Sequence, residues 1–367
     1  MIKERTYYMN LVKVLMVGSD LSVKGGMTTV VNSFLNNKFN NSDINFIPTH
    51  IENVGAMKKM LFFIRSIFKI LGNLISNNID IIHIHLSERG SFFRKFVVVI
   101  IGRVFRKKIV LHLHGANFKE FYNNNKFLQK SIRYILLKAD SVIVLGDSWN
   151  EFVKSIDSSI NTYILRNSVK CSNEIVNYDG INVRLLFLAV LIKRKGIFDL
   201  INAVSKIKDD IDLVNYNIKF IIAGTGEDEK DVKSLVSKLG VDNYFDFKGW
   251  VNGRQKVDLI KDSQIMVLPS YNEGLPVSIL EAMSYGMPVI TTDVGSIKDA
   301  VKNEVNGILI DPGDIDKLYL SIKELIINKH KWDEYSRNSK KIISEMYDQD
   351  VYFTKIEGLY NSLVKVH

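Results

Sequence analysis

The sequence contains a single cysteine, Cys171, and this scarcity excludes several kinds of protein. One cysteine can form neither an intramolecular disulfide nor an all-cysteine metal site. A chain that needs no disulfides is typical of a reducing compartment. We therefore expect a cytoplasmic protein.

Long hydrophobic runs are also missing. No apolar stretch approaches the roughly 20 residues that a membrane-spanning helix needs. Near the N-terminus the apolar residues 11–17 are interrupted by Lys13, and no cleavage-type sequence follows them. This pattern is not that of a secretory signal peptide. We expect neither a membrane span nor a leader.

Two common nucleotide-binding fingerprints are absent as well. Gly25-Gly26 follows a predicted strand and precedes a predicted helix, but no Gly-Lys-Ser/Thr comes after it, which excludes a P-loop. The three-glycine pattern of dinucleotide-binding enzymes is missing too, which disfavours an oxidoreductase. Paired glycines still let the backbone approach a ligand, and a helix N-terminus favours an anion. The alternative is an ordinary strand-to-helix turn.

What is present is globular composition over a length that suits two domains. The 367 residues are 46% hydrophobic and 24% charged. At about 150 residues per domain, this length predicts two domains, each large enough for a core. Short apolar runs alternate with amphipathic stretches, as in βαβ units with parallel sheets.

The predicted elements fall into two series separated by a polar, aperiodic segment at 168–183, which we interpret as the linker. Strands are predicted at 11–17, 79–84, 108–113 and 141–145, then at 185–190, 218–223, 244–247, 265–268 and 288–291. Helices are predicted near 27–37, 57–76, 91–106 and 126–138, then near 197–207, 228–239, 253–261, 277–285, 314–327, 331–346 and 350–364. The predicted fold class is α/β, with two Rossmann-like, doubly wound domains, whose ligands bind beyond the carboxyl ends of the strands. We expect the site in the cleft between the domains.

Charge is divided unevenly between these two series. The net charge is +9, from 49 Lys and Arg against 40 Asp and Glu. Residues 1–170 hold 24 of these cations and 11 of the anions, a net +13, whereas residues 171–367 have a net charge of −4. A basic half suggests contact with a polyanion or an anionic surface. Random Lys/Asn decoration of a solvated face is the alternative.

Histidines gather near the ends of two predicted strands of the first series. In His112-Leu113-His114-Gly115 strand alternation points both histidines to one face, where substrates bind in such sheets. His83 and His85 form a similar pair. No carboxylate or cysteine with ligand spacing accompanies them, so we predict no metal site. We expect ordinary hydrogen-bonded histidines at His83, His85 and His112, and a role in the site for His114 alone.

The strongest motif lies in the second series. A strand, a turn, a short helix, a second turn and a strand follow one another between Pro269 and Ile290, with Glu273 before the helix and Glu281 within it. The amides of Gly274, Leu275 and Val277 are expected at the helix N-terminus, open to an anion. Two carboxylates that accept hydrogen bonds from hydroxyls, together with amides that bind a diphosphate, suit a nucleotide sugar. A basic turn, Lys193-Arg194-Lys195-Gly196, opens another helix, and a bound phosphate would explain its position. The alternative is a basic turn that only faces solvent.

In this string the chain resembles the retaining glycosyltransferases of family 4, which have the GT-B fold. Their signature is two glutamates in the setting E-G-x-P-x-x-x-x-E-A-x-x-x-G-x-P-V, and residues 273–289 match it at every specified position. Other pieces fall in the family's order: Gly25-Gly26, HLHG at 112–115, KRKG at 193–196 and IIAGTGED at 221–228. One departure is Val190, which stands where the family has an arginine that meets the donor diphosphate. Arg194 is the candidate to compensate for it.

The resemblance implies a residue-by-residue assignment for a retaining, metal-independent transferase without a cofactor. Glu273 would contact the transferred sugar and stabilise charge at its anomeric carbon, His114 would line the sugar pocket, and Glu281 would hold the ribose. The leaving diphosphate would meet Lys195 and amides. The implied donor-binding set is Gly25, Gly26, Arg194, Lys195, Gly224, Gly226, Glu227, Gly274, Leu275, Pro276, Val277 and Glu281.

By the same resemblance, residues 1–170 form the acceptor-binding domain and 171–349 the nucleotide-sugar domain, with helix 350–367 packing back onto the first. The expected donor is a UDP-sugar, and the expected acceptor is a lipid-linked or other glycan of bacterial surface polysaccharide. The predicted helix 57–76 combines cations with aromatic flanks, which suits an anionic membrane surface. The predicted membrane or acceptor surface comprises Lys58, Arg65, Lys69, Arg94 and Lys95. The alternative for this helix is that it only packs on the sheet.

Two other functions stay open at this point. Val190 is compatible with a catalytically silent protein that binds a nucleotide sugar and assists a partner. The basic half is compatible with nonspecific nucleic-acid binding, although interleaved aromatic and basic motifs of the usual kinds are absent. We therefore expect no specific nucleic-acid partner and a peripheral position on the inner face of the cytoplasmic membrane.

Overall fold

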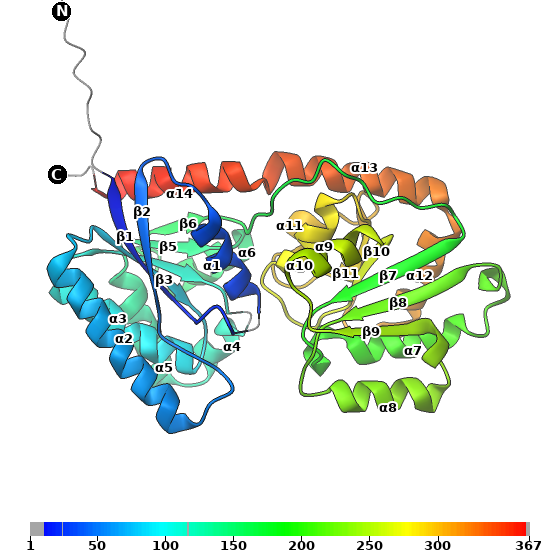
Figure 1. Ribbon diagram of the computed structural model, residues 1–367, viewed down its shortest axis with the longest axis horizontal. Coiled ribbons are helices and arrows are strands. Elements are labelled where there is room, and N and C mark those ends of the chain that lie inside the picture. Colours follow the sequence, from blue (N-terminus) through cyan, green and yellow to red (C-terminus); the bar gives the residue numbers. More distant parts are fainter. Residues whose placement is uncertain (1–10, 24, 116, 365–367) are drawn as a thin grey trace, which may run out of the picture. The chain divides into compact units, whose positions relative to one another are not determined.

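The computed structural model describes residues 11–23, 25–115 and 117–364, and the chain divides into two compact units (Figure 1). Unit 1 comprises residues 1–166 and 350–367, and unit 2 comprises residues 167–349. The end of the predicted last helix, 365–367, lies outside the described residues. Each unit is a parallel α/β sheet with helices on both faces.

The sheet of unit 1 has six parallel strands in the order β2-β1-β3-β4-β5-β6. The strand order reverses at β1, since β2 and β3 pair with its opposite edges, as in doubly wound folds. Its central strands are apolar and buried, as parallel sheets covered on both faces require. The strands are β1 (Val12–Gly18), β2 (Ser42–Pro48), β3 (Ile81–Leu86), β4 (Lys108–Leu113), β5 (Ser141–Val144) and β6 (Thr162–Ile164).

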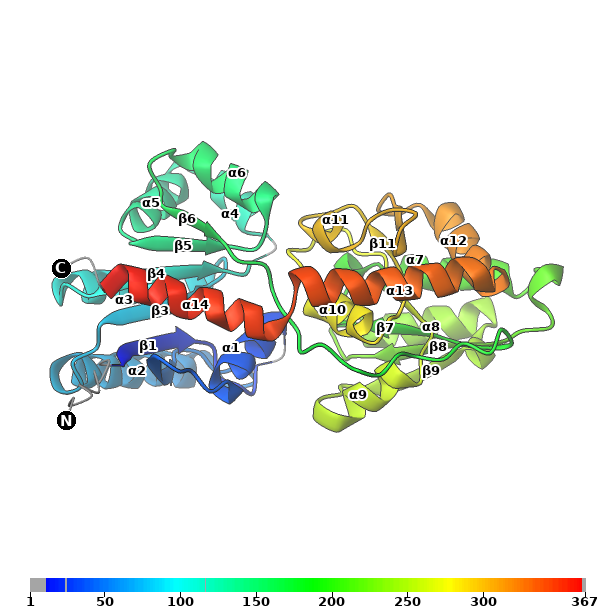
Figure 2. The same ribbon diagram turned by 90° about the horizontal axis from the view of Figure 1, so that it is seen from above.

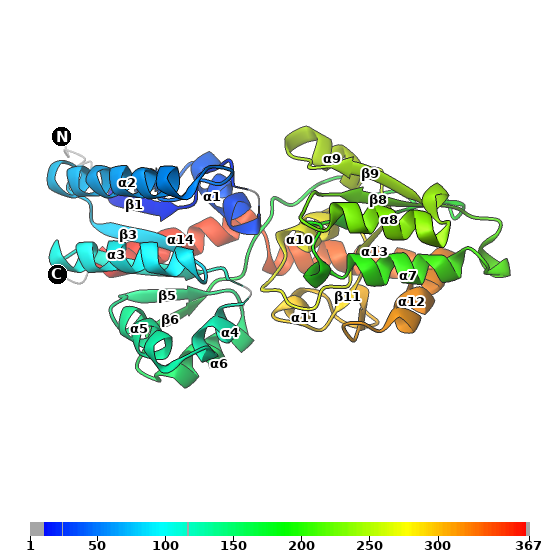
Figure 3. The ribbon, with the colours of Figure 1, turned by 90° about the horizontal axis from the view of Figure 1, so that it is seen from below.

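Helices cover both faces of this sheet. Figure 2 shows α14 lying along one face, and Figure 3 shows α2 and α3 along the other. On the α14 face, Phe34 of α1 meets Phe353 of α14 edge to face, with ring centroids 5.2 Å apart. The helices are α1 (Gly26–Asn36), α2 (Ala56–Ser76), α3 (Gly90–Val104), α4 (Phe118–Asn123), α5 (Lys126–Leu137), α6 (Asp147–Ile156) and α14 (Gln349–Val364).

Unit 2 repeats the design with the strand order β12-β11-β10-β7-β8-β9. Its strands are β7 (Asn182–Leu188), β8 (Asn217–Ala223), β9 (Phe245–Gly249), β10 (Ile265–Leu268), β11 (Val289–Thr292) and β12 (Gly307–Ile310). Its helices are α7 (Ile197–Ile207), α8 (Glu229–Leu239), α9 (Gly253–Lys261), α10 (Val277–Ser284), α11 (Ile297–Ala300), α12 (Ile315–Ile327) and α13 (Lys329–Met346). Three short 3-10 helices, η1 (Lys193–Lys195), η2 (Ile211–Leu213) and η3 (Asp242–Tyr244), complete it.

The predicted α/β class is confirmed, and the predicted strands and helices are present within a few residues of their expected ends. The sequence reading missed β2, β6 and β12 together with the short helices α4, α6 and α11. Strand β2 is an edge strand with a mixed, partly exposed pattern, and β6 has only three residues. Such segments lack the continuous apolar run that signals a buried strand. Among the described residues, no helix is both long and apolar enough to cross a membrane.

Candidate active site

The strongest motif forms a loop between β10 and α10 in unit 2, and this loop buries Glu273. The Glu273 side chain is only 6% exposed. Its Oε1 accepts hydrogen bonds from the ammonium of Lys195 and from Ser270 Oγ, the latter at 2.8 Å. Lys195 is held by η1 and is itself 15% exposed. The structure therefore brings together two residues that stand 78 positions apart in the sequence.

Other residues of the chain donate hydrogen bonds to the carbonyl groups of this loop. Arg194 Nη1 donates to the Asn272 carbonyl at 2.5 Å, and the Ser296 amide donates to the Gly274 carbonyl at 2.9 Å. Asn167 Nδ2 donates to the Leu275 carbonyl at 2.8 Å. In the described part of the chain, the amides of Gly274, Leu275 and Val277 have no acceptor. They form a row of donors at the N-terminus of α10, where an anion is favoured.

Two glycines allow the surrounding loops to approach this segment. A Cβ at Gly295, which has a φ of +60°, would lie 2.0 Å from the Glu273 carbonyl oxygen. A Cβ at Gly196, with a φ of +73°, would lie 1.9 Å from the carbonyl oxygen of Pro269. Side chains at these positions would both clash and strain the backbone. Gly196 thus lets the basic turn lie directly against the glutamate loop.

The second glutamate, Glu281, lies in the second turn of α10 and has its own cation. Its Oε1 accepts from the ammonium of Lys256 on α9, and both side chains are about one-fifth exposed, at 19% and 22%. The sequence reading did not identify Lys256, because nothing in helix 253–261 marks one lysine among its polar residues. It also missed Asn167 and Ser270, whose contacts depend on the folded chain.

The loop after β8 contains the predicted residues Gly224, Gly226 and Glu227. A Cβ at Gly224 would lie 1.8 Å from the Ala189 carbonyl oxygen, and one at Gly226 would lie 2.1 Å from that of Leu191. Both glycines are therefore required for packing, because a side chain at either position would keep the loops after β7 and β8 from making contact. Glu227 is exposed beside them. The half-buried Val190 lies in the same loop after β7.

In unit 1, Gly25 and Gly26 open α1 beyond the end of β1. Gly25 has a φ of +147°, which favours glycine, and no side chain caps the helix there. A Cβ on either glycine would meet nothing within 4 Å among the described atoms. The backbone of this turn is thus sterically open, as close approach of a ligand requires.

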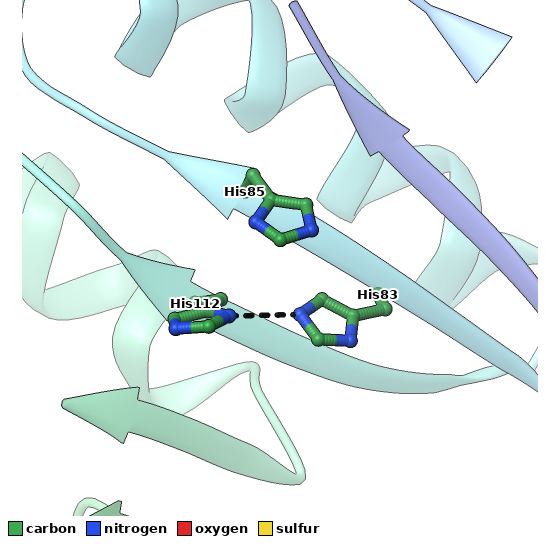
Figure 4. A group of neighbouring side chains, drawn as sticks. All are labelled: His83, His85 and His112. Carbon is green, nitrogen blue, oxygen red and sulfur yellow. Dashed lines mark hydrogen bonds between the residues drawn. The ribbon is translucent and has the colours of Figure 1, made fainter. Parts of the chain in front are cut away.

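The four histidines stack at the ends of β3 and β4, and Figure 4 shows His83, His85 and His112. His83 Nε2 and His112 Nδ1 are hydrogen-bonded at 3.2 Å, and His83 Nδ1 lies 2.6 Å from the hydroxyl of Tyr360 on α14. The half-buried His114 bonds His85 through Nε2, at 2.8 Å. Burial lowers the pKa of His114 to about 3, so its ring is neutral near pH 7. It can donate or accept a hydrogen bond there but carries no charge.

A metal ion is the alternative occupant of this cluster. One ring nitrogen from each of His83, His85 and His112 lies within 4.8 Å of the others, and burial lowers all three pKa values, which favours the neutral, ligating form. However, the pKa of His85 is lowered further by the nearby ammonium of Lys95, and a metal ion would meet the same repulsion. The group also contains no carboxylate to offset the charge. The arrangement favours a hydrogen-bonded histidine network.

Only some residues of the predicted membrane or acceptor surface are exposed. Lys58, Arg65 and Lys69 are exposed on α2, beside exposed apolar side chains of the same helix. These exposed apolar residues are Met57, Met60, Leu61, Ile64, Phe68 and Ile75. Arg94 is half-buried on α3. Lys95 does not belong to this surface, because α3 turns it toward the sheet and its side chain is fully buried.

The chain is similar to known glycosyltransferases. Residues 177–342 match the family model described as "Glycosyl transferases group 1". The chain is 25% identical over 338 residues to the Escherichia coli UDP-Gal:alpha-D-GlcNAc-diphosphoundecaprenol alpha-1,3-galactosyltransferase, covering 87% of this chain and 84% of that protein.

Solved structures show the same fold over nearly the whole chain. Sucrose-phosphate synthase from Thermosynechococcus elongatus aligns with a TM-score of 0.80 at 15% identity, covering 97% of this chain and 100% of that one. HepE from Anabaena, in complex with UDP, aligns with a TM-score of 0.76 at 18% identity, covering 95% and 100%. The fold is therefore GT-B, and the chain is a glycosyltransferase whose second unit carries the match to the group 1 family.

Proposed function

We propose that this protein is a retaining glycosyltransferase that moves a sugar from a UDP-sugar to a lipid-linked or other glycan acceptor in bacterial surface polysaccharide assembly. The observation that carries the proposal is the buried pair of Glu273 and Lys195 beside the open amides of Gly274, Leu275 and Val277. The Escherichia coli relative, whose name gives it a UDP-Gal donor and a diphosphoundecaprenol acceptor, supports the choice of substrates. The UDP complex of HepE supports the choice of nucleotide.

The proposed chemistry follows from the charges of this loop. The donor's diphosphate would bind the amide row and Lys195, which would neutralise negative charge as it develops on the leaving group. Lys195 would then divide its contacts between the diphosphate and Glu273. The Glu273 carboxylate would face the transferred sugar and stabilise the positive charge at the anomeric carbon. This arrangement supplies positive charge to the diphosphate from the protein itself.

The other predicted residues take supporting roles in this proposal. Glu281 would accept hydrogen bonds from the ribose hydroxyls, and Lys256 would hold its carboxylate in place. Arg194 donates a hydrogen bond to the Asn272 carbonyl, which stabilises the loop, and it would partly offset the absence of the family's arginine at Val190. Neutral His114 would donate a hydrogen bond to the sugar. Gly25 and Gly26 would offer an open backbone turn for donor binding.

A binding and turnover screen tests the proposal. Thermal unfolding is followed with UDP, GDP, CDP and their sugar conjugates, and a donor at 100 times its Kd should stabilise the protein by about 2.7 kcal/mol. The stabilising donor is then incubated, radiolabelled, with a bacterial lipid extract. Binding with transfer supports a transferase that uses this donor. Binding without hydrolysis or transfer for every acceptor would instead favour a silent nucleotide-sugar-binding protein, and no binding at all would contradict both.

We also propose that α2 places the enzyme on an anionic membrane. Its exposed cations lie among exposed apolar side chains, the combination that favours an interfacial helix. Each cation near an anionic leaflet contributes about 1 kcal/mol, so replacing three by glutamine should weaken vesicle binding about 100-fold. The replaced residues are Lys58, Arg65 and Lys69, and the control replaces the exposed Lys208, Lys230 and Lys341 of unit 2. Equal sedimentation of both triple variants with phosphatidylglycerol vesicles would contradict the proposal.

A further inference from the structure

Lys95 is a buried lysine with only neutral partners. Its side chain is 0% exposed, and its ammonium donates to the Gly18 carbonyl at 3.3 Å and to Thr49 Oγ1. No carboxylate of the described residues forms an ion pair with it. Buried charges are usually paired, because an unpaired one loses its hydration without an equivalent return. The position therefore lacks the anion that would normally accompany such a group.

Other cations converge on the same place. Arg94 precedes Lys95 on α3, and its Nε is buried without a hydrogen-bond partner among the described residues. Arg94 Nη1 folds back over Gly90, where an added Cβ would lie 3.1 Å from it. His50 follows Thr49, and burial together with Arg94, Lys59 and Lys95 lowers its pKa to about 4. Three cations thus act on one small region, and the His50 ring beside them is neutral near pH 7.

Acidic residues placed near this region do not supply the missing charge. The Asp20 amide donates to the His50 carbonyl at 2.8 Å, but Asp20 Oδ1 accepts from the amide and hydroxyl of Ser22, at 3.0 and 2.6 Å. The Glu88 carboxylate lies against Gly115, where an added Cβ would be 1.9 Å from its Oε2. Among the described residues, neither carboxylate forms an ion pair with Lys95 or Arg94, and Glu88 Oε2 is itself buried without a hydrogen-bond partner.

We infer that unit 1 contains a phosphate-binding subsite in which Lys95, Arg94 and Lys59 hold a phosphate or diphosphate group of the acceptor. Three cations fit a ligand with two or more negative charges better than a single carboxylate, because charge-assisted bonds to several oxygens can form at once. The half-buried Arg94 and Lys59 form the rim of the subsite, and Lys95 forms its floor.

The position of the subsite suits an acceptor. Gly18 and Thr49 lie at the carboxyl ends of β1 and β2, the edge at which open α/β sheets bind ligands. Lys59 belongs to α2, the helix that we propose lies on the membrane. A phosphate attached to a membrane-embedded lipid could reach this rim while the lipid stays in the bilayer. The inference rests on the proposed function and specifies the chemistry of its acceptor.

Calorimetry on the full chain tests the subsite, with saturating UDP present to occupy the donor site. Inorganic phosphate, pyrophosphate and farnesyl diphosphate are titrated, and farnesol is the control for binding through the lipid chain. We expect pyrophosphate and farnesyl diphosphate to bind, and Lys95→Met and Arg94→Gln to weaken both at least tenfold. Lys130→Met, an exposed lysine of unit 1, should change neither by more than twofold. Tighter binding of farnesyl diphosphate than of pyrophosphate would assign the subsite to a lipid-linked acceptor, and equal binding would assign it to the phosphate group alone.

The outcomes separate this inference from the proposed function. UDP binding together with pyrophosphate binding that ignores both variants, or with no pyrophosphate binding, would overturn the subsite and leave the donor site intact. Failure of UDP to bind would instead overturn the proposed function. If Lys95→Met does not fold, Arg94→Gln alone decides the matter. The Arg94 side chain is half-buried, and its removal creates no new unpaired buried charge.

Discussion

Replacing Lys95 by methionine is expected to stabilise unit 1, although it removes two hydrogen bonds. Burial, followed by the charge of Arg94, lowers the pKa of Lys95 from 10.5 to about 7. One pH unit corresponds to about 1.4 kcal/mol, so the charged ammonium costs the native state about 5 kcal/mol below pH 7. The two lost hydrogen bonds contribute about 1 kcal/mol each. A net gain of about 3 kcal/mol remains.

The acceptors that Lys95 leaves behind stay partnered. The Gly18 carbonyl also accepts from the amide and the hydroxyl of Thr49, at 2.9 and 3.0 Å. Methionine has a similar length and no charge, so it can fill the same space without leaving a cavity. The substitution therefore avoids the penalty of an unsatisfied buried group.

The gain should depend on pH in a defined direction. The unfolded chain holds the lysine proton up to about pH 10.5, whereas the native chain releases it above about pH 7. Between pH 7 and pH 10.5 the unfolding free energy of the wild type therefore rises relative to that of the variant. The difference in unfolding free energy between the two proteins nearly vanishes by pH 9. At 2–4 °C per kcal/mol, the variant's Tm should be about 6–12 °C higher at pH 6.

Calorimetric unfolding of the wild type, Lys95→Met and the exposed control Lys130→Met at pH 6, 8 and 9 checks this. A Tm of Lys95→Met below that of the wild type at pH 6, or the same Tm difference at pH 6 and pH 9, would contradict a cost of burying the charged ammonium. The predicted result would also show that Lys95 lowers stability, as expected of a residue kept for binding.

Two further predictions concern unit 2. Lys195→Met should weaken UDP binding at least tenfold in calorimetry, because the diphosphate loses its ammonium, whereas Lys193→Met, on an exposed side chain of the same turn, should stay within twofold; similar losses in both would mean a nonspecific charge effect. Gly295→Ala should lower the unfolding free energy by more than about 2 kcal/mol, since its Cβ would clash with the Glu273 carbonyl. Gly253→Ala, also at positive φ but with open space around it, is the matched control, and equal losses in the two would contradict a steric role.

Much of the fold could be predicted because its elements are strongly periodic. Helices α7 and α9 and strand β10 have the predicted bounds, since each is a clear apolar run or an amphipathic stretch between turns. Strands β2 and β6 were missed because edge strands are partly exposed and lack that signal. Their place in the sheet depends on pairing with distant strands, which local patterns do not encode.

The candidate site was predictable where its residues form one local string. Residues 273–281 carry a motif with fixed spacing, so the sequence marks both glutamates. Their lysine partners are different, because Lys195 and Lys256 reach the glutamates only through the packing of separate loops and helices. The sequence marks Lys195 as a candidate but not its pairing with Glu273.

Lys95 was placed on a surface because the sequence reading grouped cations by their proximity along the chain. The buried positions of α3 follow a helical period, with Phe92, Lys95, Val99 and Gly102 on one face. Applying that period to the segment would have predicted a buried lysine. A cation on an apolar helix face is thus a signal of an unusual environment.

The central claim is that Glu273 acts on the transferred sugar of a nucleotide-sugar donor. Its most direct test is the rate of sugar transfer by Glu273→Gln, which keeps the shape of the side chain and removes its charge. We expect Glu273→Gln to transfer sugar at least about 100-fold more slowly, the size expected for one electrostatic group at a transition state, with UDP affinity and the fold preserved. Transfer by Glu273→Gln at the wild-type rate would contradict the account.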